Sequence, residues 1–389
     1  MGKVRLGDIA TVITKGTTPT SLGYDFVDEG INFVKIESIT EDGNFIKDKF
    51  AYITYECNKK LGRSQLQKND ILFSIAGAIG RIAIVDESIL PANTNQALAI
   101  IRIPEGIYDY DFLKYILKSP MISQQFEKQK QGVAQINLSL KNIGDLEVPV
   151  LPIEEQKRIA YELDKVIGII YKRKEQLSKL DELVKARFVE LFGHQSHNEK
   201  NMTYGKIDDV AEIYLGLTHT PTYVENGVKF ISAKNTSCDY LDLSDVKYIS
   251  REEFEKAPKG TKPQIGDVLF SRVGSNLGHP VILDVDEELC TFVSLGFLRT
   301  KGQVTNVYLK HWMRDDFFAE QVAQKVVGGG QPNLNTGWLK EFKIIIPPMA
   351  LQNEFTAFVE QTDKSKLEVQ KSLEKLELLK KALMQKYFG

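Results

Sequence analysis

The amino-acid sequence is written twice in tandem, and this duplication limits the possible folds more than any other feature. The matching segments follow in the same order in both halves: 5–14 with 206–215, 16–20 with 218–222, 30–34 with 227–231, 69–74 with 266–271, 94–102 with 291–299, 135–138 with 331–334, and 192–193 with 388–389. The offset stays between about 196 and 202 residues throughout. We therefore expect one structural unit, present twice.

Each half divides into the same two parts. The first ~150 residues hold short apolar runs broken by Gly, Asn and Asp, which is typical of strands and turns, with helices expected at 111–129 and 307–325. A long helix is then predicted at 153–192 and again at 349–388. Apolar residues recur there in steps averaging about 3.5, which indicates a coiled-coil seam; an amphipathic helix lying on its own globular core is the alternative.

These patterns predict an α+β fold. Two pseudo-symmetric β-rich domains, 1–150 and 205–346, are joined by two long helices, 151–193 and 347–389, that form an antiparallel coiled coil. The polar segment 194–204 is the expected linker between the halves.

Composition excludes several other classes of protein. The formal net charge of −2 argues against a purely electrostatic nucleic-acid binder, although a local basic groove remains compatible with it. The three cysteines are far apart and predict neither a disulfide framework nor a zinc site. No apolar run approaches the ~18 residues of a membrane span, and the first residues lack the core of a signal peptide. We expect a cytoplasmic protein that is not in a membrane.

The expected geometry points to DNA. A helix of about 38 residues is about 57 Å long, so two domains at opposite ends of the pair would lie a few tens of ångströms apart. One turn of B-DNA is about 34 Å, the usual separation of two half-sites. Because the two halves differ in detail, the predicted double-stranded DNA site is bipartite and asymmetric. A scaffold that spaces two protein ligands would look similar.

Several segments also carry a family resemblance. They are NDILFSIAGAIG at 69–80 and GDVLFSRVGSNLG at 266–278, the Gln-x-Asn-Leu segments at 135–138 and 331–334, and the helix entries LPIEEQKRI at 151–159 and PPMALQNEF at 347–355. In this order the chain resembles the specificity subunits of Type I restriction-modification systems over nearly its whole length. The second helix entry departs from the first, since Met349-Ala350-Leu351 replaces Ile153-Glu154-Glu155.

The resemblance implies a non-catalytic subunit with two target-recognition domains. Its partners would be DNA, two methyltransferase subunits and the restriction subunits that act as translocase and endonuclease. No cofactor is expected on this chain, because S-adenosylmethionine, ATP and Mg would sit on the partners. The specificity subunit of a Type II system that cuts on both sides of its site is the alternative within the same class.

Base reading needs paired donors and acceptors on loops that enter a groove, and four loops in each half offer them. The candidates in the first half are Thr17, Thr18, Thr20, Lys35, Ser38, Ser74, Arg81, Lys130, Gln135 and Asn137. Those in the second half are Thr218, His219, Thr220, Lys234, Asn235, Ser271, Arg272, Asn276, His279, Gln331 and Asn333. The alternative is that these are solvated turns, in which the same residue types are favoured. Asp70 and Asp267 are expected to cap turns.

The sequence carries no sign of catalysis. Pro347-Pro348 is preceded by Ile346 and followed by Met349, so it does not match the (Asn/Asp)-Pro-Pro-aromatic motif of a DNA methyltransferase. Gly328-Gly329-Gly330 lacks the Gly-Lys-Ser/Thr ending of a phosphate-binding loop. His194 and His197 have no third ligand in view, so no metal site is expected. We predict a protein that is not an enzyme.

Overall fold

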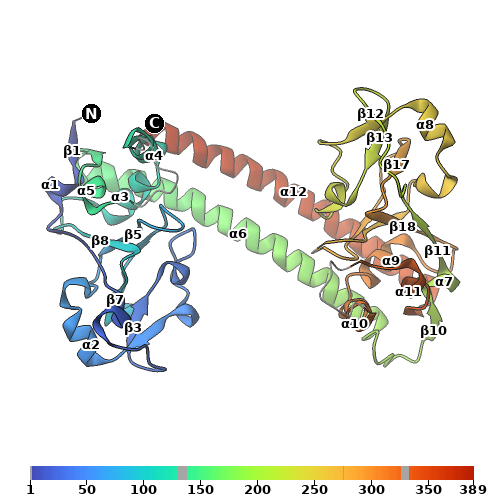
Figure 1. The fold of residues 1–389 in the computed structure, drawn as a ribbon, viewed down its shortest axis with the longest axis horizontal. Helices are drawn as coiled ribbons and strands as arrows, with labels where there is room; N and C mark the ends of the chain where they lie inside the picture. The colour runs from blue at the N-terminus through green and yellow to red at the C-terminus, as the bar shows by residue number, and fades with distance from the viewer. Residues whose placement is uncertain (1, 130–137, 275, 326–332) are drawn as a thin grey trace. The chain divides into compact units, whose positions relative to one another are not determined.

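The computed structural model describes residues 2–129, 138–274, 276–325 and 333–389 (Figure 1). The chain forms two compact units. Unit 1 is Met1–Lys174 with Lys371–Gly389, and unit 2 is Glu175–Gln370. Each unit therefore contains one β-rich domain together with one segment of each long helix.

Unit 1 is built on two small sheets. The first is antiparallel with the order β2 (Val12–Lys15), β8 (Leu98–Arg102), β5 (Ile71–Ser74), β6 (Ile82–Ile84). The second has the order β4 (Ala51–Ile53), β3 (Ile31–Val34), β7 (Ala92–Thr94). Both faces of β5 are buried, since Ile71 and Phe73 pack into one cluster and Leu72 into another. A strand covered on both faces reads as a continuous apolar run.

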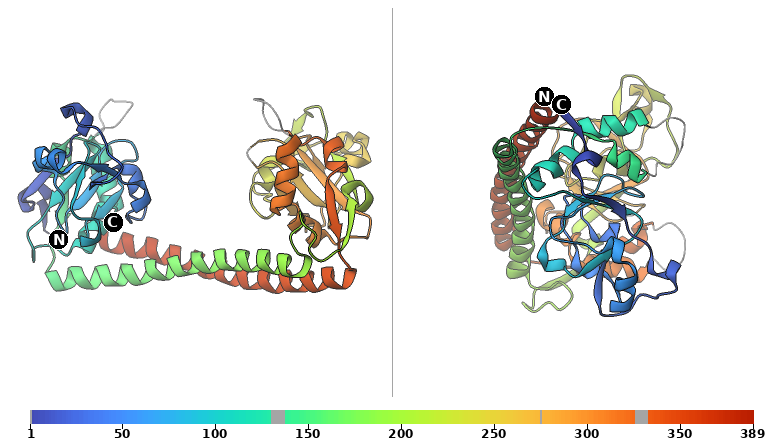
Figure 2. Two further views of the ribbon diagram at one scale, coloured as in Figure 1. Left: turned by 90° about the horizontal axis from the view of Figure 1, so that it is seen from below. Right: turned by 90° about the vertical axis from the view of Figure 1, so that its left-hand side faces the viewer.

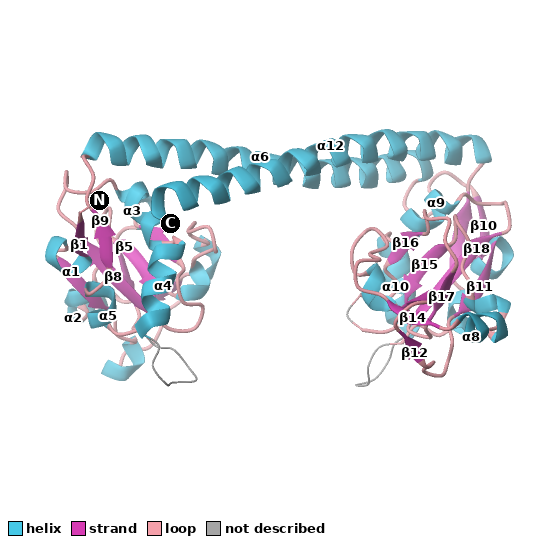
Figure 3. Cartoon of the chain, turned by 90° about the horizontal axis from the view of Figure 1, so that it is seen from above, coloured by secondary structure: helices cyan, strands magenta, loops and turns pink. Residues whose placement is uncertain are grey.

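Unit 2 repeats this plan with one additional edge strand, β12; Figure 3 labels β5 and β8 in unit 1 and β15 and β18 in unit 2. Its sheets have the orders β11 (Ala211–Leu215), β18 (Leu295–Thr300), β15 (Val268–Ser271), β16 (Pro280–Ile282) and β12 (Tyr223–Val224), β14 (Lys247–Ile249), β13 (Val228–Ile231), β17 (Leu289–Thr291). The register is also repeated, because Leu72 faces Ile100 and Leu269 faces Phe297. The first and last strands of each domain form an antiparallel pair. These pairs are β1 (Lys3–Arg5) with β9 (Glu147–Pro149), and β10 (Thr203–Lys206) with β19 (Lys343–Ile346).

The single helices expected at 111–129 and 307–325 are wrong, since each is two helices. They are α3 (Tyr110–Leu117) and α4 (Pro120–Gln129), and α9 (Asn306–Trp312) and α10 (Asp316–Lys325). Pro120 has no backbone N–H and disfavours helical backbone in the preceding residue, so a new helix begins there. In the second half the Asp315 carboxylate accepts a hydrogen bond from the Phe317 backbone N–H at 2.9 Å and caps the new helix.

The long helices are confirmed as α6 (Ile153–Phe192) and α12 (Met349–Phe388). Their segments lie side by side and antiparallel within each unit (Figure 2). In unit 1 the Tyr387 hydroxyl donates to Glu162 at 2.6 Å, whereas Lys174 meets Glu377 at 3.4 Å. In unit 2, Lys366 pairs with Asp181 at 2.5 Å, and Arg187 pairs with Glu354. No helix in the described part of the chain is long and apolar enough to cross a membrane.

Each helix pair is fused to the domain of its own unit. In unit 1 the rings of Phe112 and Phe388 are 5.5 Å apart, and in unit 2 those of Phe188 and Tyr308 are 5.5 Å apart. The contacting residues belong to the main apolar cluster of each unit. The segments of α6 and α12 that lie in each unit are thus part of the core of that unit.

A buried glutamine fixes the start of each long helix. Gln156 accepts from the Asp109 backbone N–H at 2.9 Å and donates to the Leu151 carbonyl at 2.8 Å. Gln352 repeats this with the Thr305 N–H at 2.8 Å and the Pro347 carbonyl at 2.8 Å. The second helix entry therefore keeps the anchoring contact although three neighbouring residues differ.

Candidate nucleic-acid interface

In unit 2 the predicted loops meet around one turn, residues 292–294, between β17 and β18. The Val293 N–H donates to the Leu217 carbonyl at 2.9 Å, which ties in the Thr-rich turn 218–222. The Ala233 N–H donates to the Ser294 hydroxyl oxygen at 3.3 Å, which ties in the loop that carries Lys234 and Asn235. We call residues 292–294 the central turn of unit 2.

Two further loops join the same turn. The Arg272 backbone N–H donates to the Ser294 carbonyl at 2.9 Å and brings in the glycine loop 272–279. The Arg272 carbonyl then accepts from the Leu334 N–H at 2.9 Å and brings in the late loop that contains Asn333. The four loops singled out in the second half are therefore neighbours in space.

Unit 1 has an equivalent central turn, residues 95–97. The Gly16 N–H donates to the Asn95 carbonyl at 3.1 Å, and the Thr18 hydroxyl donates to the Gln96 side-chain oxygen at 2.5 Å. The Ile75 N–H donates to the Ala97 carbonyl at 2.9 Å, and the Leu138 N–H donates to the Ile75 carbonyl at 3.0 Å. The hydrogen bonds of Ile75 recur at Arg272 in unit 2, whereas the Thr-rich turns are held to the two central turns by different hydrogen bonds.

The Thr-rich turns approach their central turns so closely that only glycine fits. A Cβ on Gly16 would lie 1.7 Å from the Thr94 carbonyl oxygen, and one on Gly216 would lie 2.2 Å from Phe292 carbonyl atoms. Both distances are below any real contact, so either side chain would push the two backbone segments apart. These two glycines thus set where the threonines that follow them lie.

The glycine loop is also tied to the loop that follows the third strand. In unit 1, Arg81 donates through Nη1 to the carbonyls of Ile39 at 3.0 Å and Ile36 at 3.3 Å. In unit 2, His279 occupies the same place, and its Nε2 lies 3.1 Å from the Cys238 carbonyl. A carbonyl only accepts, so this ring nitrogen carries the proton.

Many of the predicted site residues keep solvent-exposed side chains. Thr20, Thr218, His219, Thr220, Lys234, Asn276 and Asn333 are exposed, and Thr17, Thr18, Lys35, Arg81 and His279 are partly buried. The Lys35 ammonium lies 4.4 Å from the centroid of the Phe26 ring. Lys130, Gln135, Asn137 and Gln331 lie outside the described residues.

Five predicted site residues are buried and hold the loops together instead: Ser38, Ser74, Asn235, Ser271 and Arg272. Ser74 donates to the Ala78 carbonyl at 2.5 Å and accepts from the Arg81 N–H at 2.8 Å. Ser271 donates to the Val273 carbonyl at 3.1 Å. Ser38 donates to the Lys49 carbonyl at 2.9 Å. These side chains shape the surface and contribute little area to it.

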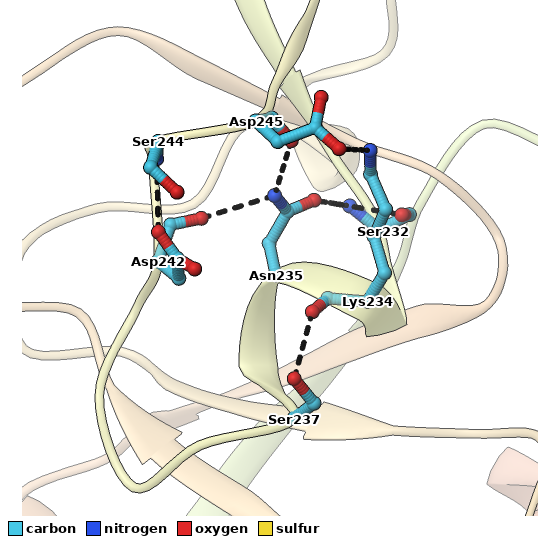
Figure 4. A network of polar contacts seen from close by, with 7 residues as sticks. All are labelled: Ser232, Lys234, Asn235, Ser237, Asp242, Ser244 and Asp245. Atoms are coloured by element: carbon cyan, nitrogen blue, oxygen red, sulfur yellow. Dashed lines mark hydrogen bonds and ion pairs between the residues drawn. The ribbon is translucent and has the colours of Figure 1, made fainter. Parts of the chain in front are cut away.

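Asn235 organises its loop from the inside (Figure 4). It accepts from the Ser232 N–H at 3.0 Å and donates to the carbonyls of Asp242 at 3.0 Å and Asp245 at 3.1 Å. Its exposed neighbour Lys234 pairs with the Asp245 carboxylate at 3.0 Å. The amide therefore fixes the backbone that carries a surface cation.

The expectation that Asp70 and Asp267 cap turns is confirmed. Each accepts from a backbone N–H three residues earlier, Gln67 and Gln264, at 2.7 Å in both units. Sequence reasoning missed that each carboxylate also binds an arginine, Arg102 or Arg299, and it missed the central turns. The equal spacing of 32 residues in both pairs was the available signal. Among the described residues, no group of three or more His, Cys, Asp or Glu side chains is placed to hold a metal ion.

Comparisons with solved structures agree with this architecture. One structure, described as the structural basis of complex assembly and conformational transition of the type I R-M system, has a TM-score of 0.61 at 19% identity over 100% of this chain and 97% of that chain. The S subunit of the Type-I restriction-modification system from M. genitalium has a TM-score of 0.54 at 15% identity over 100% of this chain and 96% of that chain. At these identities the likeness concerns the fold.

Sequence comparisons place the chain in a family. The specificity subunit of the Type I restriction enzyme MjaVIII from Methanocaldococcus jannaschii is 24% identical over 401 aligned residues, covering 98% of this chain and 90% of that protein. The EcoBI specificity subunit from Escherichia coli is 36% identical over 146 residues, covering 37% of this chain and 30% of that protein. The model of the Type I restriction modification DNA specificity domain matches residues 1–179 and again 199–378. Since the two matches together span most of the sequence, the chain belongs to the family of Type I restriction-modification specificity subunits.

Proposed function

We propose that this chain is the non-catalytic subunit through which a Type I restriction-modification enzyme selects its DNA, each unit reading one half of a bipartite site. One observation carries the proposal: in unit 2, four loops rich in hydrogen-bonding residues converge on a central turn, and in unit 1 the Thr-rich turn and the glycine loop meet the equivalent turn while Leu138 joins through Ile75. The glycine loop and the start of the following helix segment are held by the same backbone hydrogen bonds in both units, so both units would present these loops to a duplex in a similar way. The relatives named as specificity subunits support this reading.

The exposed side chains supply the base-reading chemistry. Threonine hydroxyls both donate and accept, amides pair with base edges, and lysine or arginine neutralises phosphates without selecting sequence. The two units offer different sets at matching places, such as Thr17 against His219 and Ile79 against Asn276. The half-sites should therefore differ, which makes the whole site asymmetric.

The helix pair is proposed to set the spacer and to dock the partner subunits. Both helices are unbroken over 40 residues, and each begins on a buried glutamine anchor. Two methyltransferase subunits and the restriction subunits would bring S-adenosylmethionine, ATP and Mg to the assembly. This chain would then contribute recognition and geometry.

The test uses the full chain co-expressed with its methyltransferase partner. Mapping of methylated positions should give one bipartite motif, and binding to that duplex should weaken as salt rises. Thr218→Ala with Thr220→Ala should relax one half of the motif only. The matched pair Thr17→Ala with Thr20→Ala should relax the other half only. An assembled complex that ignores DNA would overturn the proposal and favour a scaffold for protein ligands.

A further inference from the structure

Arg272 corresponds to Ile75 in unit 1, and the backbone conformation at this position does not require an arginine. The two positions make the same main-chain hydrogen bonds to the central turn and to the late loop. Unit 1 makes them with Ile75, an apolar residue that is 3% exposed. The guanidinium of Arg272 is therefore not needed for these main-chain hydrogen bonds, and its contacts serve another purpose.

The guanidinium of Arg272 is held almost entirely by neutral acceptors. It donates through Nε to the Leu334 carbonyl at 3.2 Å and through Nη1 to the Val293 carbonyl at 2.9 Å. Its Nη2 donates to the Asn333 side-chain oxygen at 3.4 Å. The side chain is 8% exposed, and burial lowers the pKa of the guanidinium. Burying a charge without a carboxylate partner is costly, which calls for an explanation beyond packing.

The contact with Asn333 determines which way its amide points. A guanidinium has donors only, so the atom facing it must be the amide oxygen Oδ1. Asn333 is exposed, and its NH2 group is therefore the polar end left for a ligand. A free asparagine presents either end and pairs well with adenine, to which it donates at N7 while accepting from N6.

We propose that Arg272 is a positioning residue that turns the Asn333 amide so that it acts toward DNA as a donor. This inference rests on the proposed function. A group with two N–H donors matches the major-groove edge of guanine, which presents two acceptors, N7 and O6. The half-site read by unit 2 should therefore contain a guanine whose recognition depends on both residues. Unit 1, with Ile75, has no such device.

The experiment measures base preference position by position in the half-sites, with the co-expressed methyltransferase complex. Arg272→Ile copies the unit 1 solution and should lower the preference for guanine at one position of one half-site by about tenfold, within the range for a bidentate base contact. Asn333→Ala should relax the same position, and the double variant should lose no more than either single variant. Asn333→Asp should turn the preference away from guanine, because it offers acceptors only.

Three controls separate positioning from general support of the fold. Arg272→Lys keeps a donor and should restore part of the preference. The tryptophan fluorescence melting transition should show whether Arg272→Ile still folds, and the other half-site should be unchanged. Equal weakening at every position of the half-site would overturn the inference, as would adenine at the position that Asn333 governs. If the wild-type complex has no bipartite site, the proposed function fails. If the site exists but these variants leave every preference unchanged, only the positioning role of Arg272 fails.

Discussion

Asp267 and Arg299 form a bidentate ion pair, with Oδ1 2.9 Å from Nε and Oδ2 2.7 Å from Nη2. Asp70 and Arg102 repeat it at 2.6 Å for both contacts. In each unit the pair joins the start of a central strand to the end of its neighbour, and the carboxylate also caps the preceding turn. The glycine loop follows the other end of that strand, so the ion pair holds in place the strand from which the loop starts.

Replacing Asp267 by alanine should lower the free energy of unfolding of unit 2 by about 3 kcal/mol, since it leaves Arg299 without its partner. The carboxylate is 3% exposed and the guanidinium 29%, which places the effect at the lower end for buried pairs. Both tryptophans, Trp312 and Trp338, lie in unit 2, so denaturant titration followed by their fluorescence reports on this unit. The matched variant Asp70→Ala should leave that transition in place. A loss below about 1 kcal/mol in Asp267→Ala would show that the pair is not important for stability.

Gly16→Ala should separate the Thr-rich turn from the central turn of unit 1, because the new Cβ would meet the Thr94 carbonyl. Overpacking of this kind costs about 1–3 kcal/mol. We expect weaker discrimination at the half-site of unit 1, with the other half-site unchanged. Methylation mapping measures both. Gly62→Ala is the control, since a Cβ there meets no atom within 4 Å. Equal loss at both half-sites would contradict the assignment of one unit to one half-site.

The duplication made much of the fold predictable. Heptad spacing predicted α6 and α12, and the repeated Asp70 and Asp267 predicted the turn caps. The remaining contacts join segments far apart in the sequence. The residues around Asp70 do not identify Arg102 as its partner, and only the 32-residue spacing repeated at Asp267 and Arg299 points to it. Nothing near Thr18 identifies Gln96. Ser74 continues the buried side of β5 that carries Leu72, so strand alternation could have indicated that it points inward. The helix break at Pro120 was visible in the sequence but was outweighed by the apolar pattern around it.

Stability of unit 2 should fall as the pH drops below 6.5. Burial, followed by the nearby cation Arg314, lowers the pKa of His311 from 6.5 to about 3. His311 packs against Phe355 with ring centroids 5.1 Å apart. The folded protein keeps the ring neutral between pH 6.5 and 3, whereas the unfolded chain takes up a proton. The contribution of the neutral His311 ring to the free energy of unfolding is therefore complete above pH 6.5. Below pH 6.5 it is lost progressively, by up to about 1.4 kcal/mol per pH unit.

His311→Phe removes this titration and keeps an aromatic ring. Fluorescence-detected unfolding at pH 7.5 and 5.5 should show a smaller acid loss in the variant, by about 1 kcal/mol. His219→Gln changes an exposed histidine and should behave as the wild type does. Identical pH dependence in His311→Phe and the wild type would mean that the ring is charged or solvated in the folded protein.

Shortening both long helices should shorten the DNA spacer. Residues 174–180 of α6 and 370–376 of α12 form one heptad in each helix, away from the glutamine anchors and the loop frameworks. Their removal takes out about 10 Å, or roughly three base pairs at ~3.4 Å each. Seven residues are nearly two helical turns, so the seam is turned by only about 20°. Methylation mapping should return the same two half-sites with a shorter gap, and insertion of one heptad in each helix should lengthen it by the same amount. An unchanged gap together with changed half-sites would mean that helix length does not set the spacing, because the deletion alters helix length and leaves the recognition loops intact.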